Sequence, residues 1–210
     1  MRAIGAEALP LALDLRNPIA ADAVVIRTLE QFGRVDALVN VAGAVPQTDL
    51  FATSDDEWAD GLSLKFHGTR RLTLRAWDAL RQAQGSVVFI SGSSAITPKA
   101  SLAAVGTINA AVSALAKAFA DRGVAEDVQV NSVLPGSVMT DRRRSMLEKY
   151  AAVDGIGFDE AVDRCAKETD IARYGAPEDI AALIVFLVSP PTRWMTGATL
   201  RMDGGEIKAV

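Results

Sequence analysis

The chain has 210 residues, with 22 Lys and Arg against 26 Asp and Glu, and a net charge of −4. Half of the residues are hydrophobic and 23% are charged, which excludes a disordered or fibrous protein. The acidic balance argues against a nucleic-acid-binding protein, which needs a basic surface. The single Cys165 excludes an internal disulfide framework and a cysteine-rich zinc site. We expect one domain over residues 1–210, a cytoplasmic location, no metal, and no stretch long enough to cross a membrane.

Short apolar runs alternate with longer helical patterns along the chain. A continuous apolar run such as residues 36–43 is typical of a strand buried on both faces of a parallel sheet. Thr53 and Ser54 are candidate caps for the helix after them, and Gly33 is a common helix stop. The patterns predict strands over 9–15, 36–43, 86–91, 127–134 and 199–203, and helices over 19–32, 55–84, 100–122 and 177–188. This alternation predicts right-handed βαβ units, and therefore an α/β fold in which helices cover both faces of a parallel sheet.

Residues 139–175 differ from the rest of the chain. Their pattern is weaker, charged, and interrupted by Gly155 and Gly157. We expect this segment to form a mobile helical excursion away from the sheet.

Three segments resemble motifs of the short-chain dehydrogenase/reductase superfamily. The sequence LVNVAG at 38–43 resembles the N-N-A-G strand end of that family. Residues 131–140 resemble its N-x-V-x-P-G-x-V-x-T segment, and residues 197–205 resemble its T-G-x-x-x-x-V-D-G-G ending. The motifs stand in the family's order and the resemblance runs from about residue 9 to residue 206. It implies a Rossmann-like fold.

The resemblance also implies that NAD or NADP binds at the carboxyl ends of the strands. Asp14 would face the adenine, although an Asp after a strand is also a good turn or cap residue. The other implied cofactor contacts are Asn40, Ala42, Gly43, Pro135, Gly136, Val138 and Thr140. Residues 139–175 would be the substrate lid, in which Arg142 could clamp a carboxylate or phosphate. The alternative for Arg142 is a solvated basic helix face.

The chain departs from the family at its beginning, because it lacks the first strand, glycine-rich turn and helix. Backbone N–H groups of that turn normally hold the pyrophosphate, so we expect cofactor binding to be impaired. Without the first strand, the strand at 36–43 would expose an apolar edge. Three outcomes stay open. The strand at 9–15 could pair directly with residues 37–42, a partner chain could cover the edge, or the chain is a fragment or mis-started reading of a longer protein.

The second departure concerns the family's catalytic Y-x-x-x-K motif. Val105 stands at the tyrosine position and Asn109 at the lysine position, and Gly92 stands where the family has its serine. Valine has no proton to give and asparagine has no charge. The usual proton donor and the cation that lowers its pKa are therefore both absent.

These replacements suggest a compensating exchange of residues. Lys65 stands where the family has an asparagine on the preceding helix, while Asn109 replaces the lysine. We expect Lys65 to supply a cation to the pocket and Asn109 to orient it. Ser91, Ser93 and Ser94 flank Gly92, and we name Ser91 or Ser93 as the substitute serine. The alternative is that Lys65 is a solvated helix lysine and that Asn109 bonds locally.

Three functions stay open. The first is an oxidoreductase of the short-chain dehydrogenase/reductase type, with NAD(P)-linked carbonyl/alcohol chemistry in a divergent active site. The second is a non-redox enzyme, such as a lyase or hydratase, that uses Lys65 in the same crevice. The third is an inactive binding or oligomer-forming relative. We expect a small-molecule substrate and, by resemblance, a homodimer or homotetramer formed through the helices at 55–84 and 100–122.

Overall fold

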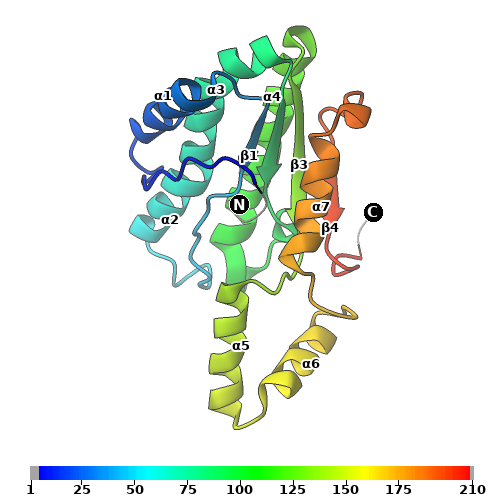
Figure 1. Ribbon diagram of the computed structural model, residues 1–210. Helices are drawn as coiled ribbons and strands as arrows, with labels where there is room; N and C mark the ends of the chain where they lie inside the picture. The colour runs from blue at the N-terminus through cyan, green and yellow to red at the C-terminus, as the bar shows by residue number, and fades with distance from the viewer. Residues whose placement is uncertain (1–4, 209–210) are drawn as a thin grey trace.

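A four-stranded parallel sheet lies at the centre of the computed structural model, which describes residues 5–208 (Figure 1). The strands are β1 (Ala37–Asn40), β2 (Ser86–Ile90), β3 (Gln129–Pro135) and β4 (Thr199–Met202), and they stand in this order across the sheet. All three neighbouring pairs are parallel. The predicted α/β fold is confirmed, and four of the five predicted strands are present.

Helices cover both faces of the sheet, so β2 and β3 are buried along most of their length. On one face, Phe89 packs with residues of α3 (Thr69–Ala83) and α4 (Ala103–Glu126), among them Leu80 and Phe119. On the other face, Val88 and Val133 pack against Leu187 of α7 (Pro177–Leu187). Both faces of the central strands are therefore removed from water, as in other parallel sheets.

The predicted helix over 55–84 is one helical run with a change of winding in its middle. It starts as α2 (Asp55–Gly61), widens into the π-helical segment η2 (Leu62–Gly68) and continues as α3. Ser54, one of the two predicted cap candidates, caps its start in a capping box with Glu57. The π-helical winding had no sequence signal that we recognised.

The predicted strand over 9–15 is wrong. Those residues form no strand, so they do not pair with β1, which within residues 5–208 has a strand neighbour on one side only. The segment is instead fixed by contacts with helices: Arg16 forms an ion pair with Asp60 of α2 at 2.5 Å, and the carbonyl of Leu15 lies against Gly68. A strand needs a neighbour that takes up its backbone hydrogen bonds, and the contacts with α2 and η2 hold this segment away from the sheet.

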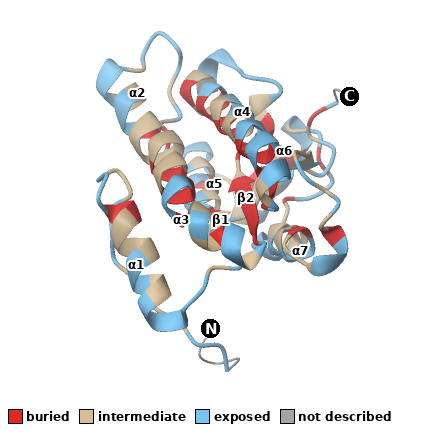
Figure 2. Ribbon diagram, turned by 90° about the horizontal axis from the view of Figure 1, so that it is seen from above, coloured by how far each residue is buried: buried red, intermediate tan, exposed pale blue. Residues whose placement is uncertain are grey.

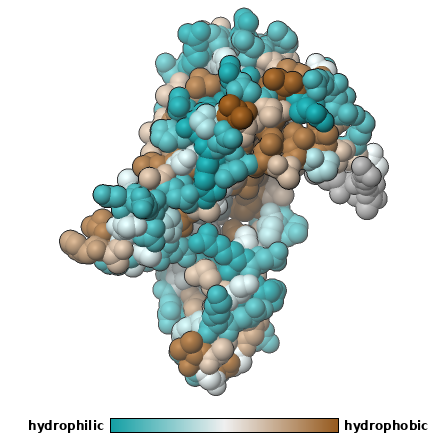
Figure 3. Space-filling model, turned by 90° about the vertical axis from the view of Figure 1, so that its left-hand side faces the viewer, coloured by the Kyte–Doolittle hydropathy of each residue, from teal (hydrophilic) through white to brown (hydrophobic). Residues whose placement is uncertain are grey.

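The next helix is α1 (Ala20–Phe32), which ends at Gly33 with φ +75°, as predicted. It packs on α3 at the edge of the molecule (Figure 2). This N-terminal part exposes several large apolar side chains, among them Leu13, Ile26 and Val41. Seen from the side on which α1 and α2 lie, hydrophobic residues gather around a hollow in the surface (Figure 3).

The predicted excursion consists of two helices that project below the sheet (Figure 1). They are α5 (Asp141–Asp154) and α6 (Phe158–Glu168), and they pack on each other around a small core that includes Leu147 and Tyr174. Two arginines stabilise this core from outside, because Arg143 lies over the Tyr174 ring and Arg144 over the Phe158 ring. The mobility of the segment stays a prediction.

The central helix α4 corrects the expectation that no stretch is long enough to cross a membrane. Together with η4 (Ala100–Leu102) it forms a run of 27 residues that is apolar enough to do so by length and composition. In the structure it packs on β2 and β3, where Val112 is fully buried, and Ile108 is fully buried against residues such as Val45 and Phe66. Its hydrophobicity is that of a core helix.

Gly123 provides a test of this packing. A Cβ atom at Gly123 would overlap the backbone carbonyl oxygen of Val128, which cannot move without shifting the start of β3. We expect Gly123→Ala to lower the free energy of unfolding by about 1–3 kcal/mol, although alanine is the better helix former. Urea denaturation measures the change. Gly157→Ser is the control, because a Cβ at the Gly157 N-cap meets nothing within 4 Å, and an unchanged midpoint in both variants would contradict the packing argument.

Candidate active site

The carboxyl ends of the strands bring together segments that are distant in the sequence. The chain after β1 contains Ala42 and Gly43, and the chain after β2 runs through Ser91 into η3 (Ser93–Ala95). The π-helical segment η2 and the first half of α4 contact each other, and α4 also contacts η3 at this edge. Crevices of α/β sheets lie at this edge.

Lys65 reaches into this edge from η2. Its ammonium group donates a hydrogen bond to Oδ1 of Asn109 and a second one, of 3.0 Å, to the backbone oxygen of Ser91. Burial lowers the pKa of Lys65 from 10.5 to about 8. The expected meeting of Lys65 and Asn109 is therefore present, whereas their catalytic roles stay predictions.

Local structure positions the Lys65 side chain in two ways. The π-helical winding of η2 interrupts the regular α-helical spacing at Lys65, and such π turns occur frequently at functional sites. Gly43 provides the space for the lysine stem, because a Cβ there would lie 3.1 Å from Cδ of Lys65. A glycine that the resemblance assigns to the cofactor thus has a role in placing the cation.

Asn109 links Lys65 to a serine hydroxyl. Its side chain is buried, with 3% of its surface exposed, and its Nδ2 donates to Oγ of Ser94 at 2.9 Å. The amide can have only this orientation, because the ammonium of Lys65 has no acceptor and must face Oδ1. Since Ser94 Oγ accepts the hydrogen bond from Asn109, its own O–H remains available to donate elsewhere.

Gly92 is required by the same arrangement. A Cβ at this position would lie 2.5 Å from Nδ2 of Asn109. A serine cannot occupy the position while Asn109 keeps its place. Lys65, Gly92 and Asn109 therefore form one packed arrangement.

The serines that flank Gly92 have different environments. The hydroxyl of Ser91 donates to the backbone oxygen of Asn109 at 2.7 Å and contacts Ser113 Oγ at 2.9 Å, so it is engaged inside the protein. Ser93 is buried and lines a cleft next to Ser94. The sequence pattern placed Ser94 among three serines that could substitute for the family's serine, although Ser91 and Ser93 were the predicted substitutes. The link of Ser94 to Asn109 could not be read from spacing, because the side-chain direction depends on the turn of η3.

Several residues that the resemblance assigns to the cofactor have internal partners. Asn40 donates to Thr73 of α3 at 3.1 Å, inside the protein. Asp14 accepts from the backbone N–H of Arg16 at 3.0 Å, which fits its alternative role in a turn. A Cβ at Gly136 would lie 2.6 Å from Cα of Asp203, so this glycine lets the chain after β4 approach β3.

The remaining assigned residues lie around the end of β3. Pro135 is the last residue of β3, Val138 pairs with Gly175, and Thr140 accepts a hydrogen bond from the backbone N–H of Arg143 as the cap of α5. Ala42 is exposed after β1. Their cofactor contacts stay predictions.

Arg142 lies near acidic residues of α2. It lines a shallow cleft together with Asp56, Glu57 and Asp60. A carboxylate or phosphate would meet these three acidic side chains as well as the guanidinium. The clamp role of Arg142 stays a prediction, and its surroundings do not favour an anion.

The donors at the strand edge fit the nicotinamide end of the implied cofactor, and the pyrophosphate end has no match. Lys65 has a third N–H beside the two that are engaged, Ser94 has a free O–H, and the backbone at Ala42 and Gly43 is exposed. These groups suit a polar amide and ribose hydroxyls. Among residues 5–208, however, no glycine-rich turn leads into a helix to hold phosphates.

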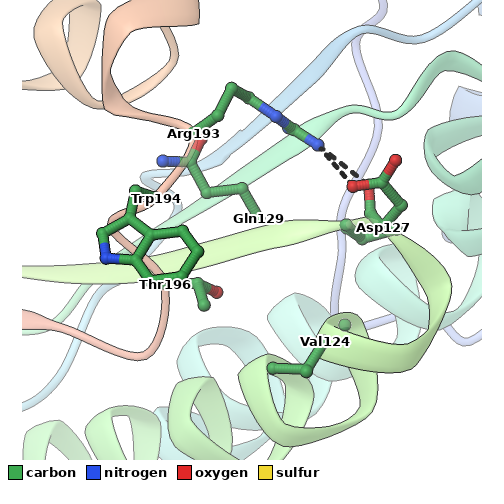
Figure 4. A pocket seen from close by; sticks show the side chains of 8 residues that line it. Val124, Asp127, Gln129, Arg193, Trp194 and Thr196 are labelled. Carbon is green, nitrogen blue, oxygen red and sulfur yellow. Dashed lines mark hydrogen bonds and ion pairs between the residues drawn. The ribbon is translucent and has the colours of Figure 1, made fainter.

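A second cleft lies at the opposite end of the sheet, where β3 starts (Figure 4). Trp194 is 98% exposed at its rim, and Arg193 pairs with Asp127 at 3.3 Å. The amide of Gln129 donates to the backbone oxygens of Thr192 and Met195. The polar groups of this cleft are thus paired within the protein, and we assign no chemistry to it.

Comparisons with known proteins agree with this architecture. Residues 1–206 match the family model described as enoyl-(acyl carrier protein) reductase. The chain is 31% identical over 207 residues to the short-chain reductase protein NovJ of Streptomyces niveus, covering 98% of this chain and 77% of NovJ. It is 34% identical over 208 residues to an uncharacterized oxidoreductase of Mycobacterium tuberculosis, covering 98% of this chain and 75% of the relative.

Solved structures give the same result. The L-sorbose reductase of Gluconobacter frateurii, solved in complex with NADPH and L-sorbose, superposes with a TM-score of 0.95 at 25% identity and covers all of this chain and 80% of the reductase. A variant of the actinorhodin polyketide ketoreductase with NADPH superposes with a TM-score of 0.89 at 27% identity, over 98% of this chain and 80% of that one. The strand order and these similarities lead to one conclusion. The chain belongs to the enoyl-(acyl carrier protein) reductase family of the short-chain dehydrogenase/reductase superfamily, a superfamily of oxidoreductases.

Proposed function

We propose that the protein is an NADP(H)-dependent oxidoreductase that interconverts a small carbonyl compound and its alcohol. In this proposal, Ser94 donates a hydrogen bond to the substrate oxygen, and Lys65 and Asn109 position and polarise Ser94. The single observation that carries the proposal is the continuous hydrogen-bond chain from Lys65 through Asn109 to Ser94. The NADPH complexes of the two structural neighbours support the choice of cofactor.

The chain of hydrogen bonds transmits the lysine's charge toward the cleft. An ammonium that donates to an amide oxygen polarises the amide, and the amide N–H then polarises the hydroxyl that accepts from it. The Ser94 O–H becomes a better donor to an oxygen on which negative charge develops. Such a group replaces the hydrogen bond, though not the acidity, of the family's tyrosine.

A bound nicotinamide would supply the hydride for carbonyl reduction and accept it in alcohol oxidation. The protein's own groups act on the oxygen: Ser94 holds it, and Lys65 keeps positive charge nearby while the oxygen is anionic. Lys99 and Lys208 at the rim of the cleft are exposed, so water reaches the cleft and completes the proton transfer.

Cofactor binding is the first testable consequence. A ligand that binds only the folded protein raises the free energy of unfolding by about 2.7 kcal/mol at 100 times its Kd. For a chain of this size the corresponding rise in Tm is about 5–10 °C. We expect NADPH to give this rise in a thermal melt and NADH to give less. An unchanged Tm at millimolar concentrations of both would contradict the proposal and favour the inactive or non-redox alternatives.

The role of Ser94 is the second testable consequence. We expect Ser94→Ala to lower kcat by about 100-fold or more, as the loss of one hydrogen bond to a developing oxyanion does, with a smaller change in KM. Steady-state kinetics with NADPH and a carbonyl substrate measure the effect. Ser101→Ala is the matched control, since Ser101 is an exposed serine close by in η4. Equal kcat values for the two variants would remove Ser94 from the reaction.

The pKa of Lys65 gives a third prediction, which does not need the cofactor. The folded pKa of about 8 lies below the ordinary value of 10.5, so between these pH values the unfolded chain holds a proton that the folded protein has released. Folding stability contributed by this group therefore rises with pH from about 8 to 10.5. We expect the stability of the unmodified protein to rise over this window relative to Lys65→Met. We also expect kcat to fall above about pH 8, because the charge is lost.

Chemical denaturation at several pH values and the pH profile of kcat provide the two measurements. Lys149→Met serves as the control, because Lys149 is an exposed lysine of α5. If both lysine variants show the same pH dependence as the unmodified protein, Lys65 is not the titrating group.

A further inference from the structure

Ser91 directly follows β2 and contacts three other parts of the protein. Its backbone N–H donates to the oxygen of Val133 on β3 at 2.9 Å, which holds it at the edge of the sheet. Its backbone oxygen accepts from the ammonium of Lys65 at 3.0 Å. Its hydroxyl donates to the backbone oxygen of Asn109 on α4 at 2.7 Å. One residue thus contacts both the cation and the asparagine on which the candidate active site depends.

These contacts close a ring of hydrogen bonds among three residues. Lys65 donates to the backbone oxygen of Ser91 and to Oδ1 of Asn109. Ser91 donates to the backbone oxygen of Asn109 and so completes the ring. The three residues come from η2, from the chain after β2 and from α4. Because each residue is bonded to both others, a displacement of one changes the geometry at the other two.

Ser113 fixes the direction of the Ser91 hydroxyl. Oγ of Ser113, which lies one helical turn after Asn109 on α4, is 2.9 Å from Oγ of Ser91. The Asn109 carbonyl has no proton, so Ser91 must donate to it and Ser113 must donate to Ser91. Ser91 is buried, with 5% of its surface exposed, and its hydroxyl has no proton left for a substrate. Ser91 can therefore act on the reaction only through its neighbours.

The ammonium of Lys65 is held by hydrogen bonds to neutral oxygens. Among the residues that the structure describes, no carboxylate forms an ion pair with it, and burial alone lowers its pKa. Attraction between opposite charges reaches over several ångströms, whereas a hydrogen bond weakens steeply when its geometry changes. The placement of this cation is therefore sensitive to small movements of Asn109.

We propose that Ser91 is a positioning residue of this site. Its hydroxyl, which Ser113 orients, holds Asn109 against the end of β2, and the Asn109 amide then keeps Lys65 connected with Ser94. The effect on catalysis rests on the proposed function, since that function assigns the polarised hydroxyl to Ser94. Without the Ser91 hydroxyl, the Asn109 carbonyl keeps the hydrogen bond of its own helix, so the protein still folds. The amide has one restraint fewer, and the lysine loses its acceptor for part of the time.

The titration of Lys65 tests this role without cofactor or substrate. A hydrogen bond to a charged group favours its charged form, so the loss of an acceptor lowers the pKa of a lysine. Carbon NMR of protein with isotope-labelled lysines measures it, and the Lys65 signal is assigned by its absence in Lys65→Met. We expect the midpoint in Ser91→Ala to lie lower by about 0.5 or more on the pH scale. Ser113→Ala should lower it less, because the Ser91 hydroxyl remains.

Ser86→Ala is the matched control for the loss of a buried hydroxyl. Ser86 lies at the other end of β2, is 4% exposed, and donates to the side chain of Gln129 at 2.7 Å. The control variant thus loses a serine hydrogen bond of the same length and similar burial, far from Lys65. A merely structural role of Ser91 would destabilise both variants and leave the Lys65 titration unchanged in both.

A double variant tests the order of the contacts. Because Ser113 acts through the Ser91 hydroxyl, Ser113→Ala should shift the Lys65 titration in the unmodified protein and have no further effect when it is added to Ser91→Ala. Shifts that add in the double variant would overturn this order. With NADPH and a carbonyl substrate, we expect Ser91→Ala to lower kcat about tenfold at an unchanged KM, less than the loss of Ser94 itself does. The fall of kcat with rising pH should begin at a lower pH.

The outcomes separate the positioning role from the redox function. A lower titration midpoint of Lys65 in Ser91→Ala, together with no oxidation of NADPH by the unmodified protein, supports the positioning role and overturns the redox function. An unchanged midpoint, or an equal change in Ser86→Ala, overturns the positioning role whatever the redox activity. If Ser91→Ala does not fold, Ser113→Ala decides, since a lower midpoint supports the role and an unchanged one overturns it.

Discussion

A lysine ammonium withdrawn from water must be given acceptors, and this constraint at Lys65 governs the candidate active site. Burial of the charge is unfavourable on its own, and it lowers the pKa of the group to about 8. The backbone oxygen of Ser91 and the amide oxygen of Asn109 provide the acceptors. The orientation of Asn109 then determines which way Ser94 can donate. The direction of one amide thus connects a helix lysine with a hydroxyl in the cleft.

The backbone accommodates this arrangement at three places. The π-helical segment η2 changes the helical winding at Lys65, and the glycines at positions 43 and 92 leave room for the lysine stem and the asparagine amide. None of these features needs a bound molecule to explain it. The site is therefore preorganised by packing, which is the condition for electrostatic stabilisation to be effective.

The sequence predicted the sheet well because buried parallel strands have a strong signal. The runs at 86–91 and 127–134 appear as β2 and β3, which are buried along most of their length. The run at 9–15 has a similar composition but forms no strand, because strand formation depends on a neighbour that composition cannot reveal. The expectation that no helix could cross a membrane was likewise wrong for α4. A core helix and a membrane helix can have the same length and the same apolar composition.

Those contacts of the site could be predicted that follow from the positions of residues within the family's motifs. The exchange of residues at 65 and 109 indicated that the two side chains meet, and they do. The hydrogen bond from Asn109 to Ser94 and the close approach at Gly136 could not be predicted in this way. The turn of η3 brings Ser94 to Asn109, and Gly136 leaves room for Asp203, which is 67 residues away in the sequence.

The contact between Asn109 and position 92 limits which residues either position accepts. Restoring the family's serine at position 92 alone would collide with the Asn109 amide, and restoring lysine at position 109 alone would set two ammonium groups side by side. The residues at positions 65, 92 and 109 are therefore coupled, and the effects of substituting them are not expected to add.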